Sequence, residues 1–138
     1  MRSQGLDKIG EQIIFNALVV SRIMYASQAF NGYLCEYDIA KLQAILNKAY
    51  RYKIIANKMD VKQMFESADV KLFSAITRVN GHCLQPLLLP KPVTSMQLRP
   101  RGHNFQLPNV ETELHKLSYL VRCLYKYVSL VYKLIVWS

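Results

Sequence analysis

Acidic residues are scarce in this chain. Its 138 residues include 9 Asp and Glu against 18 Lys and Arg, which gives a formal net charge of +9. The acids are also scattered, so the sequence offers no carboxylate cluster of the kind that holds magnesium for phosphoryl transfer. The surplus of positive charge favours polyanionic partners, which means nucleic acid or an anionic membrane surface.

Cysteine and glycine are too few and too isolated for the common metal and cofactor motifs. The three cysteines, Cys35, Cys83 and Cys123, form no CxxC pair, which argues against a disulfide framework and a structural zinc site. Cys83, beside His82, is expected to be a small buried residue. The five glycines stand singly, without a phosphate-binding GxxxxGK[ST] or GxGxxG loop. We therefore expect no cofactor, no metal and no catalytic residue.

The N-terminal segment MRSQGLDKIG is polar and charged and lacks the apolar core of a signal peptide. Isolated cysteines suit a reducing compartment. Together these features predict an intracellular protein, in the nucleus or the cytoplasm, rather than a secreted one.

Apolar residues recur at helical spacing over most of the chain. The pattern predicts a first helix over residues 6–30, which is apolar on more than one side and so requires several neighbours. A second helix is predicted over residues 38–55. A third begins at Asp60, which caps it with Gln63 reciprocating, and ends at Asn80-Gly81. The predicted apolar stripes of the three helices are Ile9, Ile13, Ala17, Val20, Ile23, Ala26 and Phe30; Ile39, Leu42, Leu46 and Ala49; and Val61, Phe65, Ala68, Leu72, Ile76 and Val79.

All five prolines lie between Pro86 and Pro108, so this region cannot be continuous helix. We expect a mainly α fold: a small helical bundle in residues 1–85, a Pro-rich basic connector in residues 86–112, and a C-terminal amphipathic helix in residues 113–138. The cations along one face of this last helix argue against a membrane span.

Positive charge is grouped into blocks that contain no acid. Between Asp38 and Asp60, the residues Lys41, Lys48 and Arg51 fall on one face of the predicted second helix, and Lys53 follows them. This face either follows a phosphate backbone or simply lies in water.

The string LRPRGHNF, residues 98–105, is the most distinctive local feature. A proline and a glycine restrain its backbone, so that Arg99 and Arg101 can project as forks toward a phosphate or a carboxylate. A structural loop, in which His103 hydrogen-bonds the turn, explains the same residues. Both interpretations stay open.

Four strings occur in the same order as at the C-terminal end of reverse transcriptases from non-LTR retrotransposons, the jockey-like mobile elements. They are FNALVVSRIMYASQAFNGYL (residues 15–34), IAKLQAILNKAYRYKII (39–55), LFSAITRVNGHCLQPLLLP (72–90), and LRPRGHNFQLP with RCLYKYV (98–128). The chain thus resembles that family over most of residues 6–128, through the order of the strings rather than through any single one.

The resemblance implies the thumb and the tail that follow the polymerase palm. The family's catalytic Tyr- or Phe-Ala-Asp-Asp motif lies upstream, and this sequence has no Asp-Asp pair. We therefore expect a non-catalytic fragment of an RNA-directed DNA polymerase, with the RNA or DNA backbone of a template-primer and the upstream polymerase domains as partners. The residues expected to bind nucleic acid are Lys41, Lys48, Arg51, Lys53, Arg99, Arg101, His103, Arg122 and Lys126.

An alternative function is helical protein–protein interaction without any nucleic-acid role. Interfacial membrane association through the cationic C-terminal segment is a third, less expected, function. Salt distinguishes the first two, because contacts to phosphates weaken steeply as salt rises and apolar contacts do not.

Overall fold

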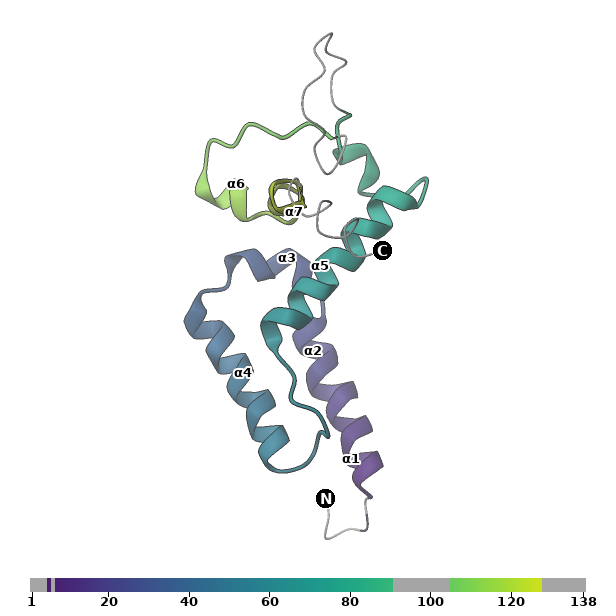
Figure 1. The fold of residues 1–138 in the computed structure, drawn as a ribbon, viewed down its shortest axis with the longest axis vertical. Helices are drawn as coiled ribbons and strands as arrows, with labels where there is room; N and C mark the ends of the chain where they lie inside the picture. The colour runs from purple at the N-terminus through teal and green to yellow at the C-terminus, as the bar shows by residue number, and fades with distance from the viewer. Residues whose placement is uncertain (1–4, 6, 91–104, 128–138) are drawn as a thin grey trace, which may run out of the picture. The chain divides into compact units, whose positions relative to one another are not determined.

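The fold is mainly α-helical, as the sequence predicts. The structure, a computed structural model, describes residue 5 and residues 7–90 and 105–127. Within these residues the regular structure is helical apart from one isolated antiparallel bridge, between Pro90 and Phe105 (Figure 1). The elements in chain order are α1 (Lys8–Phe15), a π-helical turn (Asn16–Val20), α2 (Ser21–Met24), α3 (Ser27–Phe30), a 3-10 turn (Asn31–Tyr33), α4 (Glu36–Arg51), α5 (Val61–Arg78), a second 3-10 turn (Gln85–Leu87), α6 (Glu113–Leu117) and α7 (Tyr119–Tyr127).

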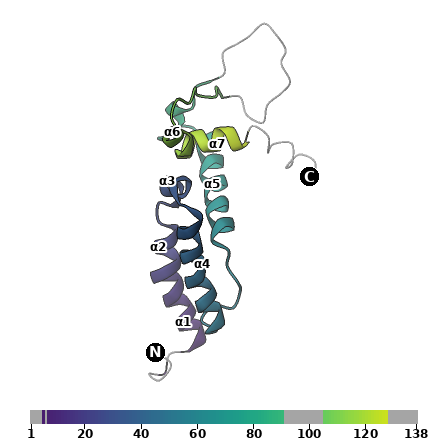
Figure 2. The ribbon, with the colours of Figure 1, turned by 90° about the vertical axis from the view of Figure 1, so that its left-hand side faces the viewer.

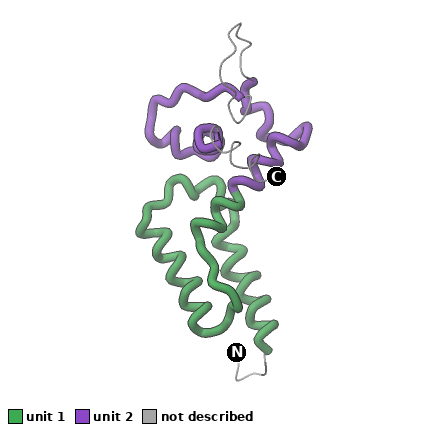
Figure 3. Tube along the Cα trace, viewed as in Figure 1, with its two compact units in different colours: residues 1–68 green, residues 69–138 purple. Residues whose placement is uncertain are grey.

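The chain divides into two compact units, residues 1–68 and 69–138 (Figure 3). The division falls within α5, whose first eight residues belong to the first unit and whose remaining residues belong to the second. The limits predicted at 85/86 and 112/113 rest on composition, and they stay predictions.

The N-terminal helix of the first unit buries a different face from the predicted one in its first part, whereas Ile23, further along the predicted stripe, is buried as expected. Ile9 and Ile13, expected inside, are 69% and 61% exposed. A π-helical turn takes up more residues than an α-helical turn, so residues four apart come into line along this stretch. The inward residues are therefore Glu11, Phe15, Val19 and Ile23.

The predicted helix over residues 6–30 is interrupted at Tyr25 and Ala26. Ala26 has a φ of 52°, in the left-handed region, and α3 begins directly after it. A left-handed residue cannot continue a right-handed helix. The break allows Phe30 to pack edge to face on Phe65 of α5, with 5.9 Å between the ring centroids. The prediction of a continuous helix was wrong here.

α4 ends four residues before its predicted end, in a Schellman motif. The N–H of Ile54 donates to the carbonyl of Ala49 and the N–H of Lys53 donates to that of Tyr50, each at 3.0 Å. Lys53 has a φ of 56°, at the position that glycine usually takes. A side chain in this left-handed conformation costs about 1–2 kcal/mol.

Gln43 joins α4 to the start of α5. Its Nε2 donates to the carbonyl of Met59, and its Oε1 accepts from the N–H of Val61, both at 2.9 Å. Asp60 caps α5 as predicted, because its Oδ1 accepts from the N–H of Lys62 at 2.8 Å. Figures 1 and 2 show α1 and α2 lying beside α4 within this unit. The buried side chains of its core are Ile23, Leu46, Val61 and Phe65.

The second unit has its own core, built on Ile76, Leu88 and Leu124. The sequence predicts one continuous C-terminal helix, and this prediction was wrong. Ser118, with an extended ψ of 147°, separates α6 from α7.

Two single-residue predictions were also wrong. Val79, expected on the buried stripe, is 53% exposed because α5 ends one residue earlier. Cys83, expected inside, is exposed in the turn that follows, whereas Cys123 is the buried cysteine.

We expect Lys53→Gly to raise the free energy of unfolding by about 1 kcal/mol, because glycine removes the steric cost of a Cβ atom in the left-handed conformation. Urea unfolding followed by circular dichroism measures the change. Ala26→Gly is the matched control and should stabilise the chain by a similar amount. Lys53→Ala keeps the Cβ atom and should change little. A Lys53→Gly chain less stable than the wild type would contradict the left-handed turn.

Candidate nucleic-acid interface

Three of the predicted cations lie on one exposed side of α4. Lys41, Lys48 and Arg51 are all exposed. Their spacing of seven and three residues arranges them along about 15 Å of the helix. Leu46 and Ala49, which are 1% and 4% exposed, anchor the inward side of α4. The cations therefore face solvent because the core holds the other side of the helix.

Two tyrosines lie among these cations. Tyr37 and Tyr52 stand four residues from Lys41 and Lys48 and are 68% and 57% exposed. The Nζ of Lys41 lies 4.0 Å from the centroid of the Tyr37 ring. Aromatic rings among cations suit nucleic acid, since bases stack on the rings and phosphates pair with the charges. Sequence reasoning missed these tyrosines, although their spacing of four from the cations was readable. We call Tyr37, Lys41, Lys48, Arg51 and Tyr52 the α4 basic face.

The charges of the α4 basic face are available to an anion. Within the described residues, no carboxylate forms an ion pair with Lys41, Lys48 or Arg51. By contrast, the Nζ of Lys62 lies 2.8 Å from the Glu36 carboxylate. Exposed pairs of this kind add little stability, but they reduce the charge that an anion meets.

Lys53 lies just beyond the α4 basic face. It lines a hollow of about 500 Å³ in the first unit, together with Lys8 at the start of α1 and Tyr50 and Arg51 at the end of α4. We call this group of four residues the basic hollow. Lys8 was not among the predicted binding residues, because only the fold places the start of α1 beside the end of α4.

Arg122 is held within the second unit. Its Nη2 lies 2.9 Å from Asp69 Oδ2, and its Nη1 donates to the carbonyl of Leu117 at 3.2 Å. The side chains of Arg122 and Asp69 are only 20% and 5% exposed. Removing one charge from a buried pair leaves the other uncompensated. Arg122 is therefore suited to holding the unit together, and its contact with nucleic acid stays a prediction. Lys126, in the last turn of α7, is exposed.

The predicted residues Arg99, Arg101 and His103 lie outside the described residues. The residues on either side of this segment pair with each other. Phe105 forms the antiparallel bridge with Pro90, and the N–H of Gln106 donates to the carbonyl of Leu89 at 2.8 Å. The role of the LRPRGHNF string stays a prediction.

Two groups near the Arg122 pair have shifted pKa values. Burial raises the pKa of the Cys123 thiol to about 11, and the neighbouring Asp69 carboxylate acts in the same direction. Burial also raises the pKa of the Tyr119 hydroxyl above its usual range. That hydroxyl donates to the backbone carbonyl of Asp69 at 3.1 Å. A nucleophilic cysteine needs a lowered pKa, so Cys123 is not activated for chemistry.

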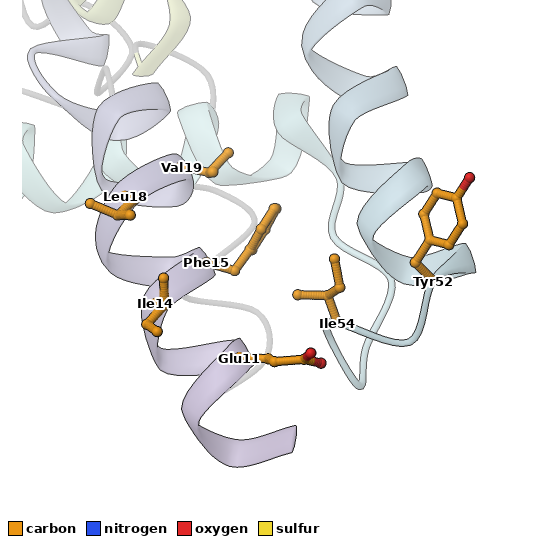
Figure 4. A pocket seen from close by; sticks show the side chains of 7 residues that line it. All are labelled: Glu11, Ile14, Phe15, Leu18, Val19, Tyr52 and Ile54. Carbon is orange, nitrogen blue, oxygen red and sulfur yellow. The ribbon is translucent and has the colours of Figure 1, made fainter. Parts of the chain in front are cut away.

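A second hollow in the first unit is apolar (Figure 4). It measures about 500 Å³, and Glu11 stands at one end of it. We call it the apolar groove; its other lining residues are Ile14, Phe15, Leu18, Val19, Tyr52 and Ile54.

Two further observations concern metals and membranes. Among the described residues, no group of three or more His, Cys, Asp or Glu side chains is placed to hold a metal ion. The stretch Lys8–Tyr33 is long and apolar enough to cross a membrane by length and composition alone, a criterion that core helices and signal sequences also meet.

Comparison of the chain with models of known protein families, with curated protein sequences and with solved structures gave no match. The resemblance to retrotransposon reverse transcriptases therefore stays a prediction from the four sequence strings.

The shifted pKa values predict a loss of stability at alkaline pH. A thiol whose pKa is raised by folding contributes its stability in full below its unfolded pKa of about 9 and loses it as the pH rises toward 11. Urea unfolding at a series of pH values from about 8 to about 11, which spans the unfolded and folded pKa values of the thiol, should show a falling free energy of unfolding. The fall should be shallower in Cys123→Val and unchanged in Cys83→Ser, whose thiol is exposed. Equal slopes in all three chains would contradict this assignment.

Proposed function

We propose that this chain binds the phosphate backbone of RNA or DNA through the α4 basic face. The observation that carries the proposal is the alignment of Lys41, Lys48 and Arg51 on one exposed side, with no carboxylate paired to them among the described residues. Contacts of this kind position a nucleic acid without reading its sequence. The exposed tyrosines on the same face add a surface on which bases can stack.

The proposed role is non-catalytic. The order of the four sequence strings supports an origin in the thumb and tail of a retrotransposon reverse transcriptase. In such a protein the template-primer and the upstream polymerase domains are the partners, and the chain acts inside the cell. The basic, helical character of the first unit fits a segment that holds a duplex while chemistry takes place elsewhere.

Salt dependence tests the proposed interface. If Lys41, Lys48 and Arg51 each neutralise one phosphate of a duplex, log K falls with log salt at a slope of about −2.7, so affinity drops about 40-fold between 50 mM and 200 mM salt. Changing all three residues to Gln should flatten the slope by about that amount. Fluorescence anisotropy with a labelled RNA–DNA duplex measures both quantities.

A matched control removes three exposed cations from other parts of the chain: Lys58→Gln, Lys71→Gln and Arg78→Gln. This variant has the same net charge as the test variant. It should keep the larger part of the salt slope, because none of its lost charges belongs to the α4 basic face. Equal losses in the two variants would show that binding follows net charge rather than this face.

A second candidate function is binding of another protein through the N-terminal helix. The observation that favours it is the exposure of Ile9, Ile13 and Leu18, at 69%, 61% and 60%. Grouped exposed apolar side chains of this size mark interaction surfaces or sites of aggregation.

Sedimentation distinguishes this function from the first. If the helix binds protein, the wild-type chain should self-associate at micromolar concentration independently of salt, and Ile13→Lys with Leu18→Lys should make it monomeric. Val70→Lys in α5 with Val79→Lys just beyond its end, two exposed apolar positions outside the N-terminal helix, is the control and should change nothing. A monomeric wild-type chain with salt-dependent duplex binding would instead favour the α4 basic face.

A further inference from the structure

The basic hollow has the composition of an anion site. It gathers three cations from two helices that lie far apart in the sequence: Lys8 from α1, and Arg51 and Lys53 from the end of α4. None of the described side chains that line it is acidic. Its volume of about 500 Å³ lies within the range of small-molecule sites. Ile55, which is 2% exposed, anchors the lining to the folded chain.

The nearest acids in the sequence have other positions. Asp7 caps α1, where its Oδ1 accepts from the N–H of Gly10 at 2.7 Å. Glu11 is 8% exposed and lines the apolar groove instead. The basic hollow therefore keeps a local excess of positive charge, although these two carboxylates lower it.

The backbone at Lys53 is also unusual for a lysine. Lysine occupies a left-handed position, with a φ of 56°, that glycine would take without steric cost. Backbone strain of this kind is often kept where a side chain serves a function. At this position the lysine contributes one of the three charges of the hollow.

Arg51 connects the hollow to the α4 basic face, since it belongs to both. A strand that lies along Lys41 and Lys48 would therefore reach the basic hollow at the end of α4. A terminal phosphate monoester carries a charge of about −1.5 to −2 and three acceptor oxygens, more than the single charge of an internal diester. Three cations lining one hollow fit the monoester better, and the Tyr50 ring, 47% exposed, offers a face for the terminal base.

We propose that the basic hollow holds the terminal phosphate of a nucleic-acid strand, with Lys8, Arg51 and Lys53 pairing with its oxygens and Tyr50 stacking on the terminal base. The proposal rests on the proposed function, because the strand reaches the hollow along the α4 basic face. The basic hollow would give the chain a preference for strand ends, whereas the α4 basic face alone would bind every internal phosphate of a strand with similar affinity.

The test compares single strands of one sequence that carry a phosphate or a hydroxyl at the 5′ end, and separately at the 3′ end, with a fluorophore at the opposite end. Anisotropy titration of the full chain should give about tenfold tighter binding of one phosphorylated strand over its hydroxyl partner, as expected for new charge-assisted hydrogen bonds. The proposal would be overturned if the phosphorylated strand and its hydroxyl partner bound with equal affinity in both the 5′ and the 3′ comparison.

Substitutions then locate the preference. Lys8→Gln with Lys53→Gly should bring the ratio of the two affinities to about one. Lys41→Gln with Lys48→Gln removes the same charge and should weaken both strands while keeping the ratio. Since Lys53→Gly is expected to fold at least as stably as the wild type, a lost ratio would not reflect unfolding. A ratio that survives in the first variant would place the preference elsewhere and overturn the proposal.

A separate measurement distinguishes failure of this site from failure of the proposed function. Inorganic pyrophosphate is titrated into the full chain at low salt, with calorimetry as the readout. If no strand binds, the proposed function fails, and pyrophosphate binding that is lost in Lys8→Gln with Lys53→Gly would still support the anion site. Absence of pyrophosphate binding to the wild-type chain would overturn the site whatever the strands do.

Discussion

Burial of one stripe of α5 is the constraint on which both units depend. Val61 and Phe65, at 0% and 1% exposure, belong to the core of the first unit, and Ile76, at 0%, belongs to the core of the second. Each buried side chain of this size contributes about 1.5–3 kcal/mol. Short helices are marginal in isolation, so α2, α3 and α6 depend on packing of this kind to persist. The side chains that remain exposed are those on the helix faces that do not pack against α5.

In the first unit this constraint fixes the rotation of α4 about its axis. Leu46 and Ala49 pack inward, and Gln43 is hydrogen-bonded to the backbone of Met59 and Val61 beside α5. The side that remains faces water, and it is the side that carries the cations and tyrosines of the α4 basic face. The proposed interface is therefore a consequence of core packing: rotating α4 to hide its cations would expose its apolar residues.

Periodicity was enough to predict that α4 and α5 exist, the row of cations on α4, and the inward stripes except for Val79, which lies beyond the end of α5. It failed where a single backbone conformation decided the outcome. The π-helical turn rotated the face of the first helix, and Ala26 and Lys53 adopt left-handed conformations that glycine would have signalled and these residue types do not. Periodicity also could not predict contacts between residues that lie far apart in the sequence. The ion pair between Arg122 and Asp69 joins residues 53 positions apart, and its partners become apparent only in the fold.

Cations at the end of α4 have a second physical explanation, and it accounts for only part of them. The last turn of a helix carries a partial negative charge from the helix dipole, so Lys48 and Arg51 are favoured there even without a ligand. This dipole does not explain why Lys8, from the opposite end of another helix, lines the same hollow. Nor does the dipole explain why a lysine stands at position 53, since its effect fades beyond the last turn. Glycine would adopt the left-handed conformation found there without strain. An anion held by all three residues accounts for each observation, which is why the inference rests on the hollow rather than on α4 alone.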